Sequence, residues 1–289
     1  MADGTAGDRA AQSEEFNFEA YAQDRAYRET NRALIARAFA QLPSPFFHID
    51  VATGTGLVPQ EVCALCRELG KRATVIGLDP DGFALESARR HTPSGPGYTV
   101  EFVQGVAQDM SHLLAGKVPL EGVDYASIHD AIHEIPGEDT KRSVLAAMAQ
   151  ILRPGGVLTY NSAFTTAALD MGAMEWGRLK AKAFAVLGGK RDRHAVAVKI
   201  HTPEEYRQMI VDAGLEVIYE GRQVVRMTRE SIAAIAHYPA FIEGVFSDMI
   251  GTEQVPLAEK HRAMMEVIQN MGAVELPRVW HEIMARKPS

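Results

Sequence analysis

Hydrophobic positions along the chain follow two alternating patterns. Short, largely apolar runs alternate with longer segments in which apolar residues recur three or four positions apart. The short runs predict strands over residues 46–52, 73–78, 98–103, 123–129 and 157–162. The longer segments predict one helix that ends near residue 69 and others over residues 81–90, 107–114 and 139–152. Strands that alternate with helices are typical of a mostly parallel sheet with helices on both faces.

The pattern changes on either side of this region. Residues 16–41 carry apolar side chains at helical spacing and predict one or two helices that end at the break Pro43-Ser44-Pro45. Beyond residue 164 the regular alternation lapses. Helices are predicted over 165–187, 203–213, 230–249 and 257–271, a loop over 188–194, and strands over 216–227 and 278–286. Thr202 is the expected N-cap of the helix at 203–213, and Gly214 is expected to close it.

These elements predict an α/β fold in one domain. We expect a seven-strand, mostly parallel, doubly wound sheet with an antiparallel last strand, and helical insertions that form a cap. The predicted segments are a disordered tail (1–15), an N-terminal helical lid (16–45), a ligand-binding core (46–163), a helical insert (164–200), a continuation of the core (201–227), a helical cap insert (228–275) and a final edge strand (276–289).

Composition narrows the class of protein. The chain has 289 residues, of which 46% are hydrophobic, so it can bury a large core. Its net charge of -7 argues against a surface that coats nucleic acid. The sequence shows neither a signal peptide nor an apolar run long enough to span a membrane, and its two cysteines indicate a reducing, cytoplasmic environment. A homodimer is compatible with this composition.

The segment from Asp50 to Gly56 (Asp-Val-Ala-Thr-Gly-Thr-Gly) is the most informative motif. It joins a strand to a helix, and glycines there let a ligand approach the backbone beside the helix N-terminus. A dinucleotide loop would favour a third glycine, but Pro59 stands in that place. A carboxylate at Asp50 suits a cation better than a phosphate. Asp79 ends the second predicted strand, where an acid can accept both hydroxyls of a ribose.

Three motifs in this order resemble the class I S-adenosylmethionine (SAM)-dependent methyltransferase family. They are the glycine-rich turn at 50–56, the acidic motif Gly77-Leu78-Asp79-Pro80 and the turn Leu152-Arg153-Pro154-Gly155-Gly156 before the fifth strand. The strands at 216–227 and 278–286 fit the sixth and seventh strands of the family. The resemblance therefore covers most of the chain.

The resemblance implies SAM as the cofactor and a set of residues that hold it. Asp50, Gly54 and Gly56 are expected around the methionine part, and Asp79 at the ribose. The full expected set is Asp50, Ala52, Thr53, Gly54, Gly56, Asp79, Pro80, Val106, Ala107 and His129. One position departs from the family, which often has an acid after a glycine at the third strand to bind adenine. Here the pair is Gly105-Val106, so Asp109 or a backbone carbonyl must serve.

Polar residues after the fourth predicted strand are candidates for chemistry. His129 is expected nearest the methionine end of SAM, and His133 or Glu134 could remove a proton from the acceptor. Capping of the next helix or hydrogen bonding to the backbone is the alternative reading of each. The spacing of His129 and His133 also allows a metal pair, but Pro136 follows closely and no third ligand is evident, so we predict no metal site.

Two other features have structural explanations that we favour. Cys63 and Cys66 form a C-x-x-C inside a predicted amphipathic helix rather than at its N-terminus, so we expect buried, inert thiols. The inserts are rich in Met and aromatic residues at helical spacing. Packing within the cap is the expected role of these residues, although they also suit the wall of an apolar acceptor site.

The predicted function is transfer of a methyl group from SAM to an oxygen, nitrogen or carbon nucleophile of a small, partly apolar acceptor. Two alternatives remain open at this point. One is a nicotinamide-dependent oxidoreductase on a Rossmann-like fold, which Asp50 and Pro59 disfavour. The other is a SAM-binding protein without methyl transfer, such as a cyclase or a partner module.

Overall fold

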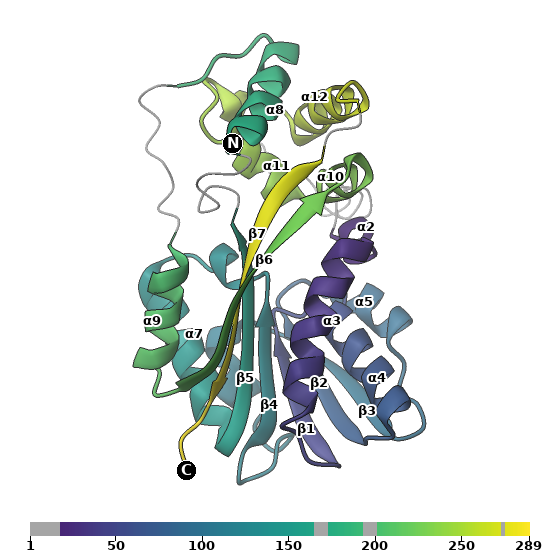
Figure 1. Cartoon of the computed structure of the whole chain (residues 1–289), viewed down its shortest axis with the longest axis vertical. Helices are drawn as coiled ribbons and strands as arrows, with labels where there is room; N and C mark the ends of the chain where they lie inside the picture. Colours follow the sequence, from purple (N-terminus) through teal and green to yellow (C-terminus); the bar gives the residue numbers. More distant parts are fainter. Residues whose placement is uncertain (1–17, 165–172, 193–200, 273–274) are drawn as a thin grey trace. The chain divides into compact units, whose positions relative to one another are not determined.

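A seven-stranded mixed sheet organises the chain (Figure 1). The computed structural model describes residues 18–164, 173–192, 201–272 and 275–289. The strands are β1 Phe46–Val51, β2 Ala73–Asp79, β3 Tyr98–Gln104, β4 Val123–His129, β5 Leu152–Phe164, β6 Glu216–Met227 and β7 Leu276–Arg286, in the spatial order β3-β2-β1-β4-β5-β7-β6. The predicted α/β fold with a seven-strand, mostly parallel sheet is confirmed.

Helices connect these strands in most places where the sequence predicts them. The α-helices are α2 Glu19–Ala22, α3 Arg25–Phe39, α4 Leu57–Leu69, α5 Gly82–His91, α6 Met110–Leu113, α7 Glu138–Ile151, α8 Ala173–Val186, α9 Pro203–Asp212, α10 Arg229–Ile235, α11 Pro239–Phe246 and α12 Leu257–Gln269. Three short 3₁₀ helices are η1 Ala107–Asp109, η2 Ile132–Glu134 and η3 Thr252–Gln254. Thr202 caps α9 as expected and forms a reciprocal capping box with Glu205.

The strand order requires one correction to the predicted sheet. β7 lies between β5 and β6, so the edge strand is β6 and the prediction of a final edge strand is wrong. Burial gives the physical reason, because nine of the eleven residues of β7 are buried, whereas β6 alternates exposed and half-buried residues. The antiparallel direction of the last strand is confirmed, since Gly155 N and Lys287 N donate to Lys287 O and Gly156 O at 2.9 Å each.

The predicted helix at 230–249 is wrong as a single element. It is two helices, α10 and α11, and the second begins at Pro239. Proline lacks a backbone N–H and its ring clashes with the preceding turn, so it is tolerated only in the first turn of a helix. The predicted helix at 165–187 is observed from Ala173, and residues 165–172 lie outside the described residues.

The turn before the fifth strand is a bulge rather than an interruption. β4 and β5 pair Val123 with Leu152 and then Tyr125 with Val157, so β5 carries three more residues than β4 over this step. Gly155 adopts a positive φ of 76°, which a side chain would strain. Gly155 and Gly156 within this bulge exchange backbone hydrogen bonds with Lys287, which directly follows β7.

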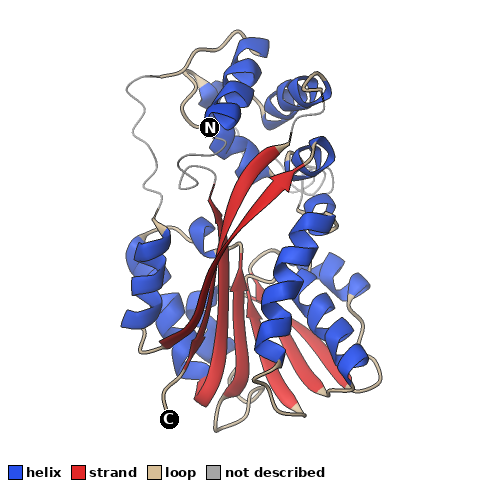
Figure 2. Ribbon diagram, viewed as in Figure 1, coloured by secondary structure: helices blue, strands red, loops and turns tan. Residues whose placement is uncertain are grey.

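The described residues form two compact units. The sheet unit comprises residues within Arg28–Ala163, His201–Gln223 and Trp280–Ser289. Within it helices cover both faces of the sheet (Figure 2), with α3 packed beside α4 on one face and α7 beside α9 on the other. The carboxyl ends of the parallel strands β1, β2, β3 and β4 meet at one edge of this unit.

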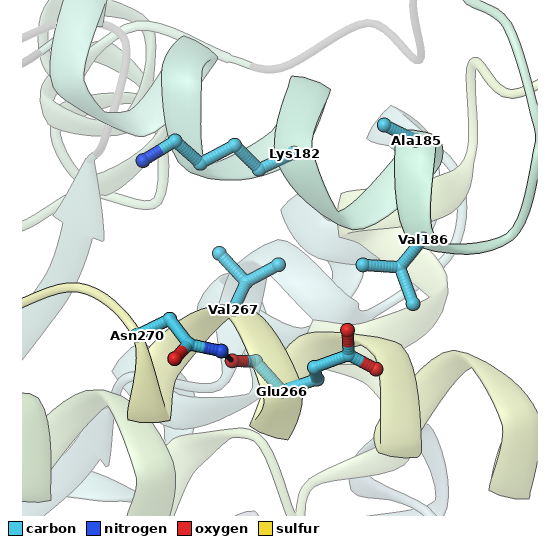
Figure 3. Close-up of a pocket in the computed structure, with 6 residues that line it drawn as sticks. All are labelled: Lys182, Ala185, Val186, Glu266, Val267 and Asn270. Carbon is cyan, nitrogen blue, oxygen red and sulfur yellow. Dashed lines mark hydrogen bonds between the residues drawn. The ribbon is translucent and has the colours of Figure 1, made fainter.

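The helical unit comprises the described residues within Met1–Tyr27, Phe164–Ile200 and Val224–Val279. Phe246 and Ile242 of α11 are fully buried, and the Phe184 ring of α8 lies 5.5 Å from that of Phe246. A groove of about 390 Å³ runs between α8 and α12 (Figure 3) and is lined by Lys182, Ala185, Val186, Glu266, Val267 and Asn270. Within the described ranges, no helix combines the length and the apolar character that a membrane span requires.

The interior position of β7 predicts that a substitution in β7 lowers the free energy of unfolding far more than one in the edge strand β6. Ile283 of β7 is 0% exposed, so Ile283→Ala should lower the free energy of unfolding by about 3 kcal/mol through lost burial and a residual cavity. Val224 of β6 is 52% exposed, and Val224→Ala should change it by less than about 0.5 kcal/mol. Urea unfolding of both variants measures this difference. Equal losses would show that β7 is not held as an interior strand.

Candidate functional site

The glycine turn bends the chain sharply between β1 and α4. Ala52, Gly54 and Gly56 all have positive φ angles, of 55°, 53° and 83°. Thr53 N donates to Leu78 O at 3.0 Å, which fastens the turn to the end of β2. A left-handed conformation at a non-glycine residue such as Ala52 costs free energy and is often found at functional sites.

The two glycines of this turn have different roles. A Cβ atom added to Gly56 would lie 2.9 Å from the Cβ of Ala88, so this glycine permits the close packing of the turn on α5. A Cβ atom added to Gly54 would meet no protein atom within 4 Å. Gly54 therefore borders open space, as the prediction of close ligand approach requires.

Asp79 is oriented by two backbone N–H groups. Its Oδ2 accepts from Gly54 N at 2.8 Å and its Oδ1 accepts from Asp81 N at 2.9 Å. Burial raises the pKa of Asp79, and these two hydrogen bonds oppose that change. Each carboxylate oxygen keeps acceptor capacity for a further partner, because an ionised carboxylate offers about four acceptor positions.

Asp50 lies one strand away and is almost fully buried, with 1% of its surface exposed. Ser127 Oγ of β4 donates to Asp50 Oδ1 at 2.6 Å. Burial raises the pKa of Asp50 to about 7, and the hydroxyls of Ser127 and Thr53 oppose this rise. A cation beside Asp50 would favour its ionised form.

The end of β3 presents an apolar surface. Gly105 N donates to Asp79 O at 3.0 Å, so the residues after β3 are held next to the end of β2. Val106 is 41% exposed, whereas Ala107 is buried. Phe83, in the first turn of α5, is 48% exposed and was missed by the sequence analysis. An exposed aromatic residue shortly after a strand-end acid was the signal that could have identified it.

His129 lies in a buried polar network rather than beside open space. Its Nδ1 is 2.9 Å from Asn31 Oδ1, and its Nε2 is 2.9 Å from Thr159 Oγ1. Because the carbonyl Oδ1 of Asn31 only accepts, Nδ1 carries the proton and Nε2 accepts from Thr159. Tyr125 OH, 2.7 Å from Thr159 Oγ1, then donates to that hydroxyl. Burial lowers the pKa of His129 to about 3, so its ring is neutral.

The same network fixes the chain just after β4. Asn161 Nδ2 donates to Asn31 Oδ1, and Asp130 N donates to Asn161 Oδ1, both at 2.9 Å. Asp130 has a positive φ of 50° and accepts from Ala163 N through Oδ1 at 3.2 Å. Asn31, Asp130 and Asn161 were not predicted as site residues from the sequence. Polar residues within otherwise apolar strand and helix patterns were the available signal.

His133 and Glu134 lie in η2, immediately beyond this strained residue. His133 Nδ1 is 3.1 Å from Ser162 Oγ, and His133 Nε2 is 3.9 Å from Glu134 Oε1. The two side chains are 33% and 37% exposed. Unlike His129, both therefore reach solvent at the carboxyl end of β4.

Other chemistry at the site is limited. Within the described ranges, no group of three or more His, Cys, Asp or Glu side chains is arranged to hold a metal ion. The predicted burial of Cys63 and Cys66 is confirmed, and it raises the pKa of their thiols to about 12 and about 11. Such thiols are poor nucleophiles at neutral pH.

Comparison with known proteins agrees with this geometry. Residues 49–158 match the family of methyltransferase domains. No curated protein matches the sequence.

Three solved structures illustrate the similarity of fold. The N-methyltransferase NodS of Bradyrhizobium japonicum, solved with S-adenosylhomocysteine, is 12% identical with a TM-score of 0.52, over 92% of this chain and 90% of that one. A SAM-dependent methyltransferase of Methanosarcina mazei is 14% identical with a TM-score of 0.50, over 86% and 96%. The [4+2]-cyclase SpnF is 16% identical with a TM-score of 0.51, over 89% and 81%.

The domain match and the strand order define the class of protein. Residues 49–158 match a methyltransferase domain, and the seven-strand order supports the fold of the class I SAM-dependent methyltransferase family, as the motifs of the sequence predict. The family is an enzyme class, and S-adenosylmethionine is its methyl donor.

The buried state of His129 predicts an acid-sensitive contribution to stability. Its pKa is about 3 when folded and near 6.5 when unfolded, so the unfolded chain binds more protons between these values. The free energy of unfolding should therefore fall as pH drops from 7 to 5, by about 2 kcal/mol from this group. His129→Gln should lose about 2 kcal/mol less than the wild type over this interval, measured by urea unfolding. If the wild type and His129→Gln lose the same free energy of unfolding between pH 7 and pH 5, His129 is not held neutral by the fold.

Proposed function

We propose that the carboxyl edge of β1, β2 and β3 holds SAM, and that the chain methylates a small acceptor. The observation that carries this proposal is the meeting of Gly54 and Asp79. The Gly54 backbone borders open space and is tied to the Asp79 carboxylate, which keeps acceptor capacity. An open backbone turn beside an oriented acid suits a ligand with a ribose diol.

The remaining cofactor residues follow from their positions in the strands. Asp50 would accept from the ammonium group of SAM, directly or through water, and the turn Ala52–Thr53–Gly54–Gly56 would enclose the methionine part. Asp79 and Pro80 would hold the ribose. Val106 and Ala107 would contact the adenine, and the exposed Phe83 ring adds a further apolar surface there. When bound, SAM supplies an electrophilic methyl group on sulfur.

We assign different roles to the three candidate catalytic residues. Both ring nitrogens of His129 are engaged by Asn31 and Thr159, which favours a positioning role at the end of β4. His133 and Glu134 are partly exposed and adjacent, so they are the better candidates for removing a proton from the acceptor. Holding the acceptor in line with the methyl group would supply most of the rate enhancement.

The acceptor is proposed to be a small, partly apolar molecule. The net charge of -7 does not favour a nucleic-acid substrate. The helical unit offers exposed apolar side chains, including Met174 at 62% and Ile250 at 61%, whereas Phe184 and Phe246 are buried and serve its packing. We extend the proposal to a cytoplasmic enzyme in which the helical inserts select the acceptor.

The first test compares ligands and a matched pair of variants by calorimetry. We expect SAM to bind and NAD not to bind. Gly54→Val should abolish SAM binding, because the side chain would occupy the open space beside the turn. Gly70→Val is the control. Gly70 also has a positive φ and open space around its Cα, but it lies at the opposite end of α4.

Both variants should lose a similar free energy of unfolding, about 1 to 3 kcal/mol, because each forces a β-branched residue into a left-handed conformation. Only Gly54→Val should lose SAM. Binding of NAD in place of SAM would favour an oxidoreductase. Unchanged SAM affinity in Gly54→Val would exclude this turn as the cofactor site.

The second test concerns the inserts. If they close over bound ligands, SAM or S-adenosylhomocysteine should slow proteolysis within residues 164–200 and 228–275, since closure orders the segments that carry cleavage sites. Limited digestion with and without ligand, followed by mass spectrometry of the fragments, measures this effect. Equal cleavage rates in both conditions would leave the inserts without a role in closure.

A further inference from the structure

Beneath the glycine turn, three buried polar side chains form a chain of hydrogen bonds. Ser127 Oγ lies 2.8 Å from His48 Nε2 and donates to Asp50 Oδ1 at 2.6 Å. His48 and Ser127 are 0% exposed, and Asp50 is 1% exposed. No step of the proposed methyl transfer uses His48 or Ser127, yet both lie directly behind the carboxylate that is proposed to face the ammonium group.

The register of the sheet makes these contacts unavoidable. β1 and β4 are parallel, with His48 opposite Tyr125 and Asp50 opposite Ser127. Side chains opposite one another in a sheet point to the same face. The His48 ring stacks on the Tyr125 ring with centroids 4.2 Å apart, which fixes the orientation of the imidazole toward Ser127.

The direction of donation along this hydrogen-bond chain follows from counting the available protons. A serine hydroxyl has one proton, and Ser127 gives it to Asp50. Ser127 Oγ must then accept from His48, so the proton of the imidazole lies on Nε2. His48 Nδ1 is buried and has no hydrogen-bond partner among the described residues. In this tautomer it is a bare lone pair and not a buried N–H group.

The opposite direction would be less favourable. A protonated Asp50 could donate to Ser127, which would donate to His48 Nε2, and the remaining imidazole proton would move to Nδ1. That proton would then be a buried donor without an acceptor, and orphaned buried N–H groups are rarer in proteins than under-satisfied acceptors. The environment of Nδ1 therefore favours the direction in which Asp50 is the final acceptor.

From this geometry we infer that His48 and Ser127 are positioning residues, which form a one-directional hydrogen-bond chain that favours the ionised form of Asp50 and orients its carboxylate. The purpose of this chain rests on the proposed function, in which ionised Asp50 receives the ammonium group of SAM. The hydrogen-bond chain is already present in the protein without ligand, so it can be tested separately from SAM binding.

The other groups around Asp50 do not replace this chain. Burial raises the pKa of Asp50, and charge repulsion from Asp79 raises it further. Tyr125 stays neutral because burial raises its pKa. Burial and the nearby His129 lower the pKa of His48, so the imidazole is also neutral and supplies no positive charge to Asp50. Hydroxyl donors, of which Ser127 makes the short bond to Oδ1, are what oppose neutralisation of Asp50.

The direct test is ¹³C NMR of aspartate-labelled protein without SAM, with the Asp50 carboxyl signal assigned through Asp50→Asn. We expect a titration midpoint near pH 7 in the wild type, and about one pH unit higher in Ser127→Ala. His48→Phe keeps a flat ring to stack on Tyr125 but removes the Nε2 donor, and it should move the midpoint in the same direction. Ser127→Thr keeps the hydroxyl and should restore the wild-type value.

Ser87→Ala is the matched control. Ser87 is a buried serine of α5 that contacts His91, outside this chain, and its removal should leave the Asp50 midpoint unchanged. A midpoint in Ser127→Ala and His48→Phe that stays within 0.2 pH units of the wild type overturns the inference. A shift of the same size in Ser87→Ala also overturns it, because the effect would then reflect a general loss of packing.

Calorimetry with SAM separates this inference from the proposed function. The ratio of the Ser127→Ala dissociation constant to that of the wild type should be about tenfold at pH 6 and about twofold at pH 8, as a midpoint one unit higher requires. The ionisation of SAM itself cancels in this ratio. NMR shifts with a ratio that is independent of pH would support the chain and overturn the role of Asp50 in holding the ammonium group.

Discussion

The parallel pairing of β1 with β4 is the constraint on which the site depends. At this pair the sheet order changes direction, because β2 and β3 lie on one side of β1 while β5 and β7 lie beyond β4. Connections on the two sides therefore leave the sheet over opposite faces, and in folds with this change of direction ligands bind at the carboxyl ends of the strands. The register also fixes which side chains are neighbours, and it places Asp50 opposite Ser127.

This register buries a polar layer that must satisfy itself. His48, Asp50, Ser127 and His129 are each at most 6% exposed, and a buried polar group without a partner is costly. Two hydrogen-bond chains give each of these four side chains at least one partner, one chain ending at Asp50 and the other passing through His129 to Asn31. Satisfied networks of this kind fix protonation states and side-chain rotamers together. The layer beneath the glycine turn is therefore held in one arrangement, as the proposed cofactor site requires.

The sequence was sufficient for features that depend on local pattern. β1 to β4, the turn around Gly54 and the acid Asp79 follow from apolar runs and short motifs, which involve neighbours in the chain. The contact between Asn31 and His129 joins residues 98 positions apart, and no local pattern reveals it. The interior place of β7 likewise depends on which distant strand it joins. Pro239 was different, because the break it causes was visible but was outweighed by the apolar spacing around it.

The division of the chain into two units matches the proposed separation of cofactor binding from acceptor choice. The proposed cofactor contacts come from backbone turns and strand ends of the sheet unit, whose register leaves little freedom to vary. The helical unit is built largely from the connections after β5 and β6, and it has its own buried residues, including Ile242 and Phe246. A segment that buries its own apolar surface can change in sequence without disturbing the sheet. Variation in acceptor is therefore expected to reside in the inserts, whereas the turn and the polar layer beneath it remain suited to one cofactor.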